Sequence, residues 1–226
     1  MTNDKKRHVI PGEVIVSGPY RPEQNTVLEG DRILATTIGL SDVHDGSVRV
    51  IPLTGGYYPK EDDLVIGKII SHSAMSWEVD INSCYSGMLP ATDVFGRDFS
   101  SHSDDLSSKL RKGDLIATRI VNSDKTRDPL LTISGRELGK IDYGELVEIS
   151  PSKVARLIGK RGSMIQMIES ATRAQITIGQ NGLIVIACED SDGLLRAINA
   201  VELVEEKAHV ADLTDRISEM LELKSD

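Results

Sequence analysis

The sequence has few cysteines, few aromatic residues and no long apolar run. Its two cysteines, Cys84 and Cys188, lie far apart and lack the spacing of a metal site. No run of about 18 apolar residues could form a membrane-spanning helix, and the basic N-terminus lacks the apolar segment of a secretory signal. We therefore expect a reduced, cytoplasmic protein with no membrane partner. Aromatic residues make up only 4% of the chain, which limits its capacity to stack on bases.

The polar residues show no pattern that predicts catalysis. The histidines are scattered without metal-ligand spacing, at His8, His44, His72, His102 and His209. Acidic pairs such as Asp62-Asp63 and Asp104-Asp105 are typical of solvated loops, and the nucleotide-binding pattern G-x-x-x-x-G-K-[ST] is absent. We therefore expect no catalytic residue, no metal site and no cofactor.

Charge is distributed unevenly along the chain. The formal net charge of −9 argues against a protein that coats nucleic acid over its whole surface. Between residues 151 and 173, however, five cationic side chains accompany a single acidic one. From residue 201 to residue 226, eight acidic residues accompany three basic ones. The sequence therefore predicts a local basic site within an acidic protein.

Residues 1–59 predict a small β module. Short apolar stretches, GEVIVSG, DRILATTIGL and GSVRVIPL, alternate with glycine-containing turns and have no helical period. A module of this size buries little apolar surface by itself, so we expect it to depend on a neighbour.

Residues 60–138 predict a five-stranded barrel. In the stretch SWEVDI, Trp77, Val79 and Ile81 alternate with Glu78 and Asp80, which is the period of a half-buried strand. The expected strands span residues 64–70, 76–81, 86–90, 114–121 and 129–134. The long polar connection over 91–112 is expected to be a mobile loop with a helical turn. Five strands with a long connection after the third match the oligonucleotide-binding (OB) barrel.

Residues 139–226 change to a helical period. After the strand GELVEIS, Ser150 and Pro151 are typical of a helix start, and Gly159 ends that helix. A second helix begins at Ser163, with Gln166 at the spacing of a capping box. The strands QITIG and LIVIA follow, joined by a GQNG turn whose Asn-Gly step favours a hairpin, and a third helix comes last. The predicted order is β-α-α-β-β-α.

Residues 212–223 predict one further helix. Its apolar positions, Leu213, Ile217, Met220 and Leu221, share one face. We interpret this face as packing on the preceding domain, with contact to a partner protein as the alternative.

The loop between the first two helices reads Gly159-Lys160-Arg161-Gly162. The glycines permit backbone angles and a close approach that a Cβ would block. The cations lie at the tip, where they can neutralise phosphate, and the next helix presents its free N–H groups at the same place. A simple helical corner with solvated cations would need only one glycine, so we favour a phosphate-binding loop.

This arrangement resembles a type I KH domain over residues 144–207. In that family, the G-x-x-G loop clamps about four nucleotides of single-stranded nucleic acid. The resemblance implies RNA binding by Gly159, Lys160, Arg161, Gly162, Lys153 and Arg156.

The middle segment resembles the RNA-binding barrel repeated in ribosomal protein S-one. The matching stretches are VIGKI, GMLP, RKGDLIATRIV and LLTIS. Such barrels stack bases on surface aromatics beside a basic groove. The resemblance implies RNA contacts by Trp77, Tyr85, Phe95, Arg97, Lys125 and Arg127. Trp77 is equally well interpreted as a core residue, because it shares a face with Val79 and Ile81. Tyr85, in the turn NSCYSG, is the better stacking candidate. The other four, Phe95, Arg97, Lys125 and Arg127, are equally well interpreted as solvated.

The β module, barrel and KH domain together resemble the RNA-binding cap subunits of the archaeal exosome. The resemblance is carried by IPLTGGYYPKEDDLVIGKI, WEVDINSCYSGMLPATDV, VARLIGKRGSMI and GQNGLIVI. It implies a non-catalytic subunit, three copies of which sit on a hexameric ring of phosphorolytic RNase PH-like subunits. The N-terminal module would dock on the ring, and single-stranded RNA would enter 3′ end first. The chain departs from the family in its acidic balance and at Cys84, where a proline is expected.

A transcription or translation factor built from the same two modules is the alternative. Bacterial elongation factors of this kind carry a barrel followed by two KH domains. Here only one G-x-x-G lies in the β-α-α-β-β-α frame, and the remaining tail is too short for a second domain.

Overall fold

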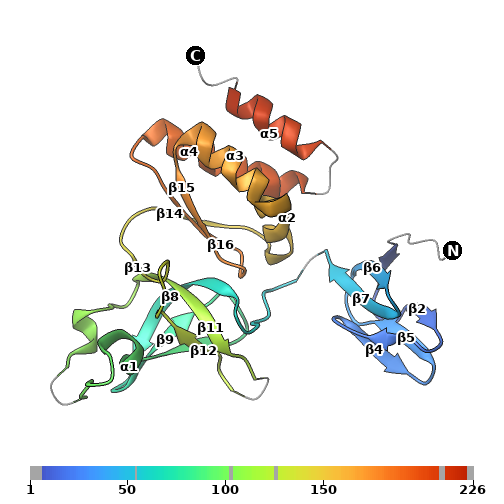
Figure 1. Ribbon diagram of the computed structural model, residues 1–226, viewed down its shortest axis with the longest axis horizontal. Helices are drawn as coiled ribbons and strands as arrows, with labels where there is room; N and C mark the ends of the chain where they lie inside the picture. Colours follow the sequence, from blue (N-terminus) through green and yellow to red (C-terminus); the bar gives the residue numbers. More distant parts are fainter. Residues whose placement is uncertain (1–6, 54, 102–103, 125–126, 209–211, 223–226) are drawn as a thin grey trace. The chain divides into compact units, whose positions relative to one another are not determined.

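The computed structural model describes residues 7–53, 55–101, 104–124, 127–208 and 212–222. The chain divides into two compact units, Met1–Gly55 and Gly56–Asp226. The first is built from short strands, and the second combines a β-barrel with a helix-covered sheet (Figure 1).

The first unit contains two small sheets, with the strand orders β1-β6-β7-β3 and β2-β5-β4. The strands are β1 (His8–Val9), β2 (Val14–Ser17), β3 (Arg21–Pro22), β4 (Thr26–Glu29), β5 (Arg32–Ala35), β6 (Gly39–His44) and β7 (Ser47–Pro52). The β6–β7 hairpin turns through Asp45 and Gly46, whose φ angles of 46° and 77° suit a two-residue turn. The buried cluster is small, with Val9, Ala35 and Val50 at its centre.

The second unit begins with a closed barrel. Its five strands are β8 (Leu64–His72), β9 (Ser76–Asp80), β10 (Ser86–Pro90), β11 (Leu115–Asn122) and β12 (Leu130–Thr132), and β13 (Gly139–Ile141) follows them. The order β12-β10-β9-β8-β11, with β12 also paired to β11, closes the five-stranded barrel that the sequence predicts. β13 adds to β11, so its pairing favours a boundary after Ile141, whereas the sequence places the boundary after residue 138. The domain boundary after residue 138 stays a prediction.

The connection after β10 contributes to the barrel core. It contains helix α1 (Ala91–Phe95) and a 3-10 turn, η1 (Leu106–Ser108). Leu106 and Leu110 are buried in the same cluster as the strand residues. The expected helical turn is therefore present, and two apolar side chains of the connection pack into the barrel core. The mobility of the loop stays a prediction.

The rest of the second unit has the predicted β-α-α-β-β-α order. The sheet order is β14 (Glu145–Glu148), β16 (Leu183–Ala187) and β15 (Gln175–Ile178), antiparallel throughout. The helical elements are η2 (Pro151–Lys153), α2 (Val154–Ile158), η3 (Lys160–Gly162), α3 (Ser163–Thr172), α4 (Ser191–Lys207) and α5 (Leu213–Glu222). Helices cover one face of the sheet (Figure 1).

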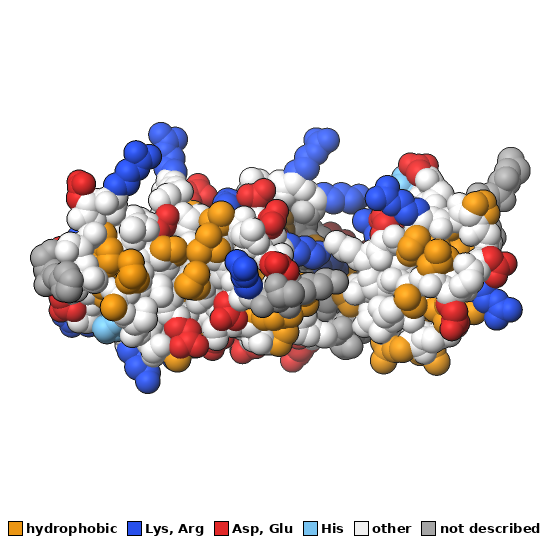
Figure 2. All heavy atoms as spheres, turned by 90° about the horizontal axis from the view of Figure 1, so that it is seen from below, with side chains coloured by type: hydrophobic (Ala, Val, Ile, Leu, Met, Phe, Trp, Pro, Cys, Tyr) orange, Lys and Arg blue, Asp and Glu red, His pale blue; other side chains and the backbone are white. Residues whose placement is uncertain are grey.

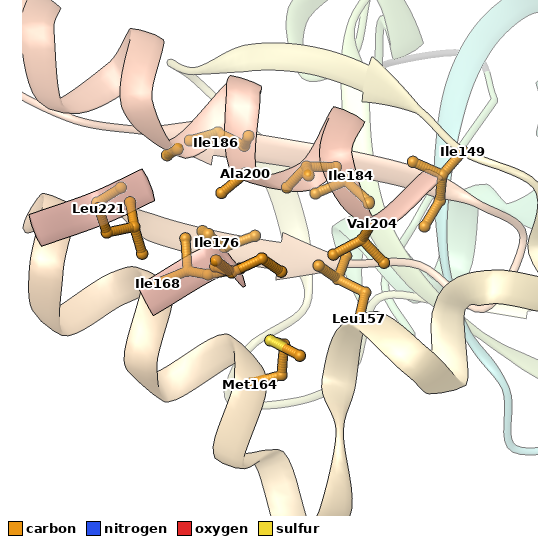
Figure 3. Close-up of a cluster of buried hydrophobic side chains, with 14 of the residues drawn as sticks. Ile149, Leu157, Met164, Ile168, Ile176, Ile184, Ile186, Ala200, Val204 and Leu221 are labelled. Carbon is orange, nitrogen blue, oxygen red and sulfur yellow. The ribbon is translucent and has the colours of Figure 1, made fainter. Parts of the chain in front are cut away.

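One apolar core joins these helices to the sheet. Side chains from α2, α3, α4, α5 and all three strands converge in a single cluster, including Leu157, Ile168 and Ile184 (Figure 3). On α5, Leu213, Ile217 and Leu221 are buried in this cluster, and the guanidinium of Arg196 on α4 donates to the Leu221 carbonyl at 2.5 Å. The interpretation of this helix as packing on its own domain is confirmed.

The β15–β16 hairpin ties this domain to the barrel. Its tip residue Asn181 is fully buried, and its Nδ2 donates to the backbone oxygens of Ile66 at 2.7 Å and Ile81 at 2.9 Å. Its Oδ1 accepts from the Ile66 N–H at 3.3 Å. β9 pairs with β8 only as far as Lys68 and Asp80, so the amide of Asn181 supplies the bonds that a longer strand would have made. The Asn-Gly hairpin is confirmed, and its asparagine has a role that the turn pattern does not predict.

Candidate nucleic-acid interface

The loop Gly159–Gly162 connects α2 to α3 through an unusual backbone path. Gly159 has φ 72° and ψ −178°, and a Cβ there would lie 2.8 Å from the Met164 Cβ and 2.9 Å from the Met164 N. Gly162 has φ 80° and ψ 10°, but a Cβ there would meet nothing closer than 3.7 Å. The first glycine is therefore required by close packing and the second by its left-handed backbone. Arg161 also has a positive φ, of 53°.

The start of α3 differs from the sequence prediction. Its N-cap is Gly162, and no side chain caps the first turn. Ser163 already has helical angles of −61° and −37°, so the predicted capping box with Gln166 is wrong. Because no side-chain cap occupies this end, the first-turn N–H groups can meet an anion at the loop.

The two cations of the loop are exposed. In the described part of the chain, neither Lys160 nor Arg161 forms an ion pair with an acidic side chain. Arg156, one turn earlier on α2, is also exposed. Lys160 and Arg161 therefore project from a loop whose backbone is itself accessible to a phosphate.

Lys153, the remaining predicted contact of this group, has an internal partner. Its Nζ donates to the Glu205 Oε1 at 2.6 Å and to the Glu205 backbone oxygen at 2.7 Å. Ser150 precedes Pro151 as predicted, but its hydroxyl donates to Glu205 at 2.7 Å and does not cap the helix. Partial burial opposes ionisation of Glu205, yet the bonds from Lys153 and Ser150 outweigh it and lower the pKa of this carboxyl. Lys153 thus anchors η2 to α4.

Trp77 lies inside the barrel. It is 0% exposed, its indole N–H donates to the Leu110 carbonyl at 3.1 Å, and its ring stacks on Phe95 with centroids 6.2 Å apart. The prediction that Trp77 stacks on a base is therefore wrong, because no face of the indole reaches solvent. The alternative interpretation of Trp77 as a core residue is confirmed.

Tyr85 lies beside a second tyrosine that the sequence analysis missed. The rings of Tyr58 and Tyr85 are 5.8 Å apart and perpendicular, and Tyr58 is 45% exposed. The neighbouring Tyr58 hydroxyl raises the pKa of Tyr85 above its ordinary value. The paired aromatics offer a surface for one base. The YYP stretch before the barrel was the available signal, since it lies within the segment quoted for the family resemblance.

The other predicted barrel contacts are dispersed. Phe95 is partly buried between Trp77 and Phe99, with the Lys109 ammonium 6.0 Å from its ring centroid. Arg97 and Arg127 are exposed. Lys125 lies outside the described residues. Among the described residues, neither Arg97 nor Arg127 lies over the ring of Tyr58 or Tyr85.

One face of the molecule shows mixed charge. On the face seen in Figure 2, Lys and Arg side chains project as separate groups with acidic side chains among them. Among the described residues, no group of three or more His, Cys, Asp or Glu side chains could hold a metal ion. None of the described helices combines the length and the apolar character needed to cross a bilayer.

Two family models match different parts of the chain. The model for the KH domain matches residues 144–203, which contain the Gly159–Gly162 loop. The model described as the exosome RNA binding protein RRP4 N-terminal domain matches residues 6–54, which correspond to the first compact unit.

Individual relatives match over almost the full length. The exosome complex component Rrp4 of Nitrosopumilus maritimus (strain SCM1) is 66% identical, over 99% of each chain. That of Thermofilum pendens (strain DSM 2475 / Hrk 5) is 41% identical, over 96% of this chain and 94% of the relative. A crystal structure of a protein provisionally assigned as an exosome complex RNA-binding protein is 42% identical, with a TM-score of 0.71 over 75% of this chain and 97% of the other. The chain therefore belongs to the Rrp4 family of exosome complex components.

Proposed function

We propose that this chain is a non-catalytic, cytoplasmic RNA-binding cap subunit of an archaeal exosome. It captures single-stranded RNA and passes the 3′ end into a phosphorolytic ring of RNase PH-like subunits. The observation that carries this proposal is the Gly159–Gly162 loop of a chain of the Rrp4 family, whose two exposed cations form no ion pair with any described residue.

The loop and the barrel have complementary tasks. Lys160 and Arg161 neutralise phosphates, and the absence of a side chain at Gly162, where the space is open, lets the RNA backbone approach the start of α3. Tyr58 and Tyr85 stack on a base at the barrel. Because Asn181 holds the two domains together, both contacts have a fixed separation, and RNA bound by one is presented to the other at a high effective concentration.

The N-terminal unit supplies the attachment to the ring. Three cap subunits per hexameric ring, each with two weak RNA sites, would compensate for the modest affinity expected of an acidic chain. The chain divides into two compact units at Gly55, which supports the proposal that the first unit is an independent docking module.

A pull-down from archaeal cells tests the complex. The tagged full chain should retain stoichiometric RNase PH-like subunits after a salt wash, whereas a variant lacking residues 1–55 should lose them and still bind RNA. Recovery of ribosomes or RNA polymerase without the ring would instead support the transcription or translation factor and reject the cap assignment.

A further inference from the structure

The outer edge of the KH sheet is open at β14. This strand is the first in the order β14-β16-β15, and it pairs only with β16 among the described strands. An edge strand presents backbone N–H and C=O groups that another chain can pair with. Leu146, in its middle, is 38% exposed.

Helix α4 forms a second wall beside this edge. A groove of about 620 Å³ lies between the two elements. It is lined on the strand side by Glu145, Leu146, Val147 and Glu148 and on the helix side by Ile198, Glu202, Glu205 and Glu206. Its volume is within the range of peptide and small-ligand sites. Val147 and Ile198, both packed against the domain core, give the groove an apolar floor. Leu146 pairs with Val185 and lies on the opposite face of the sheet, the face toward the barrel.

The charge of the groove has one sign. None of the residues that line it is a lysine or arginine. Glu205 is committed to Lys153, and Glu148 accepts from Asn82 at 3.2 Å. In the described part of the chain, no cation pairs with Glu145, Glu202 or Glu206. Their mutual repulsion is therefore relieved only by solvent or by a cationic ligand.

These features select the occupant. RNA is disfavoured because its phosphates would meet several carboxylates without an intervening cation. A second copy of this groove is disfavoured because pairing two β14 edges would bring two sets of glutamates together. An extended segment rich in Lys and Arg satisfies both the backbone edge and the charge.

We propose that the groove between β14 and α4 binds a basic, extended segment of a partner protein, which adds a strand to β14. The segment places its cations on the helix side of the sheet, near Glu145, Glu202 and Glu206, and its alternate apolar side chains on the opposite face, beside Leu146. This site is separate from the Gly159–Gly162 loop, so a protein partner and RNA can be bound together.

A labelled seven-residue peptide of alternating lysine and valine provides the test, with fluorescence anisotropy on the full chain at moderate salt. Glu202→Gln/Glu206→Gln should weaken binding about fivefold, the effect of losing two solvent-exposed charge contacts. Asp215→Asn/Glu219→Gln, which removes the same charge from α5, should leave binding unchanged. In hydrogen exchange, the peptide should slow the amides of β14.

Three results would overturn the proposal. Equal weakening by both double variants would mean that the peptide responds to net charge alone. Equal affinity for a peptide whose valines are replaced by prolines would exclude strand addition, since proline cannot donate a backbone hydrogen bond. Absence of measurable binding would mean that the glutamates serve only to keep the sheet edge from pairing.

Discussion

Asn181 donates from its side-chain amide to the backbone oxygen of Ile66 at a distance of 2.7 Å. The bond crosses from the KH hairpin to the barrel and is buried on both sides. It is reinforced by apolar contact among Ile66, Leu183 and Val185. The barrel and the KH domain therefore share one joint in which a single polar side chain satisfies several backbone groups.

Asn181→Ala should destabilise the second unit by about 3 kcal/mol, because it leaves the buried Ile66 and Ile81 carbonyls without their donor. Urea unfolding measures the change. Gln180→Ala is the matched control, since the neighbouring side chain is exposed and only its backbone N–H bonds to the barrel. Equal stability of the two variants would contradict the assigned role of Asn181.

Lys160→Asp/Arg161→Asp should weaken binding of single-stranded RNA roughly tenfold and reduce the slope of log K against log salt by about 1.4, because two phosphate contacts are lost. Affinity measured across a salt series checks both values, and circular dichroism checks the fold. Lys207→Asp/Arg216→Asp changes the net charge equally on α4 and α5. If that control had the same effect, the loop would not be the clamp.

The two loop glycines should differ in their tolerance of alanine. Gly159→Ala should cost about 3 kcal/mol, since its Cβ would overlap the Met164 backbone as well as strain φ. Gly162→Ala should cost about 1 kcal/mol, because only the left-handed backbone is penalised. Thermal unfolding of the two variants shows which substitution is more destabilising. A larger loss of stability for Gly162→Ala than for Gly159→Ala would contradict this prediction.

Substitution of Trp77 should affect only stability, and substitution of Tyr85 should affect only RNA binding. Trp77→Phe should lower stability by about 2 kcal/mol, because the Leu110 carbonyl loses its donor inside the barrel, and should leave RNA affinity unchanged. Tyr85→Ala should do the opposite, with a loss of about 1 kcal/mol or more in RNA binding free energy. Unfolding and RNA-binding titrations on the same samples test both expectations. A loss of RNA affinity in the Trp77 variant alone would contradict the assignment of Trp77 to the core and of Tyr85 to RNA contact.

Glu205 should contribute stability that depends on pH. Its pKa is lowered in the folded protein, so the contribution is full above its unfolded value of about 4.3 and is lost as the pH falls through the folded value. Glu205→Gln should therefore be less stable than the parent by about 1 kcal/mol at pH 7, with the difference vanishing at low pH. Denaturation at pH 7, 5 and 3 would follow this change. A constant difference would show that the ionised carboxylate is not what stabilises the contact.

Much of the architecture could be predicted from local sequence. The alternation around Trp77 predicted β9, and the glycine at position 159 predicted the end of α2, because period and backbone freedom are properties of a few neighbouring residues. The Gly159–Gly162 loop could be recognised for the same reason. The prediction of a capping box was wrong because the Ser-x-x-Gln pattern does not say which residue is the N-cap. Here Gly162 is the N-cap, and Ser163 is already inside the helix.

The sequence by itself determined the order of the elements, the barrel and KH frames and the position of the two-cation loop. Only the tertiary structure decided which polar and aromatic residues face solvent. Trp77 is buried, Lys153 is paired with Glu205, Tyr58 lies beside Tyr85, and Asn181 reaches the barrel. Each of these outcomes depends on residues distant along the chain, and burial and hydrogen bonding across such distances are set by packing, which no local pattern encodes.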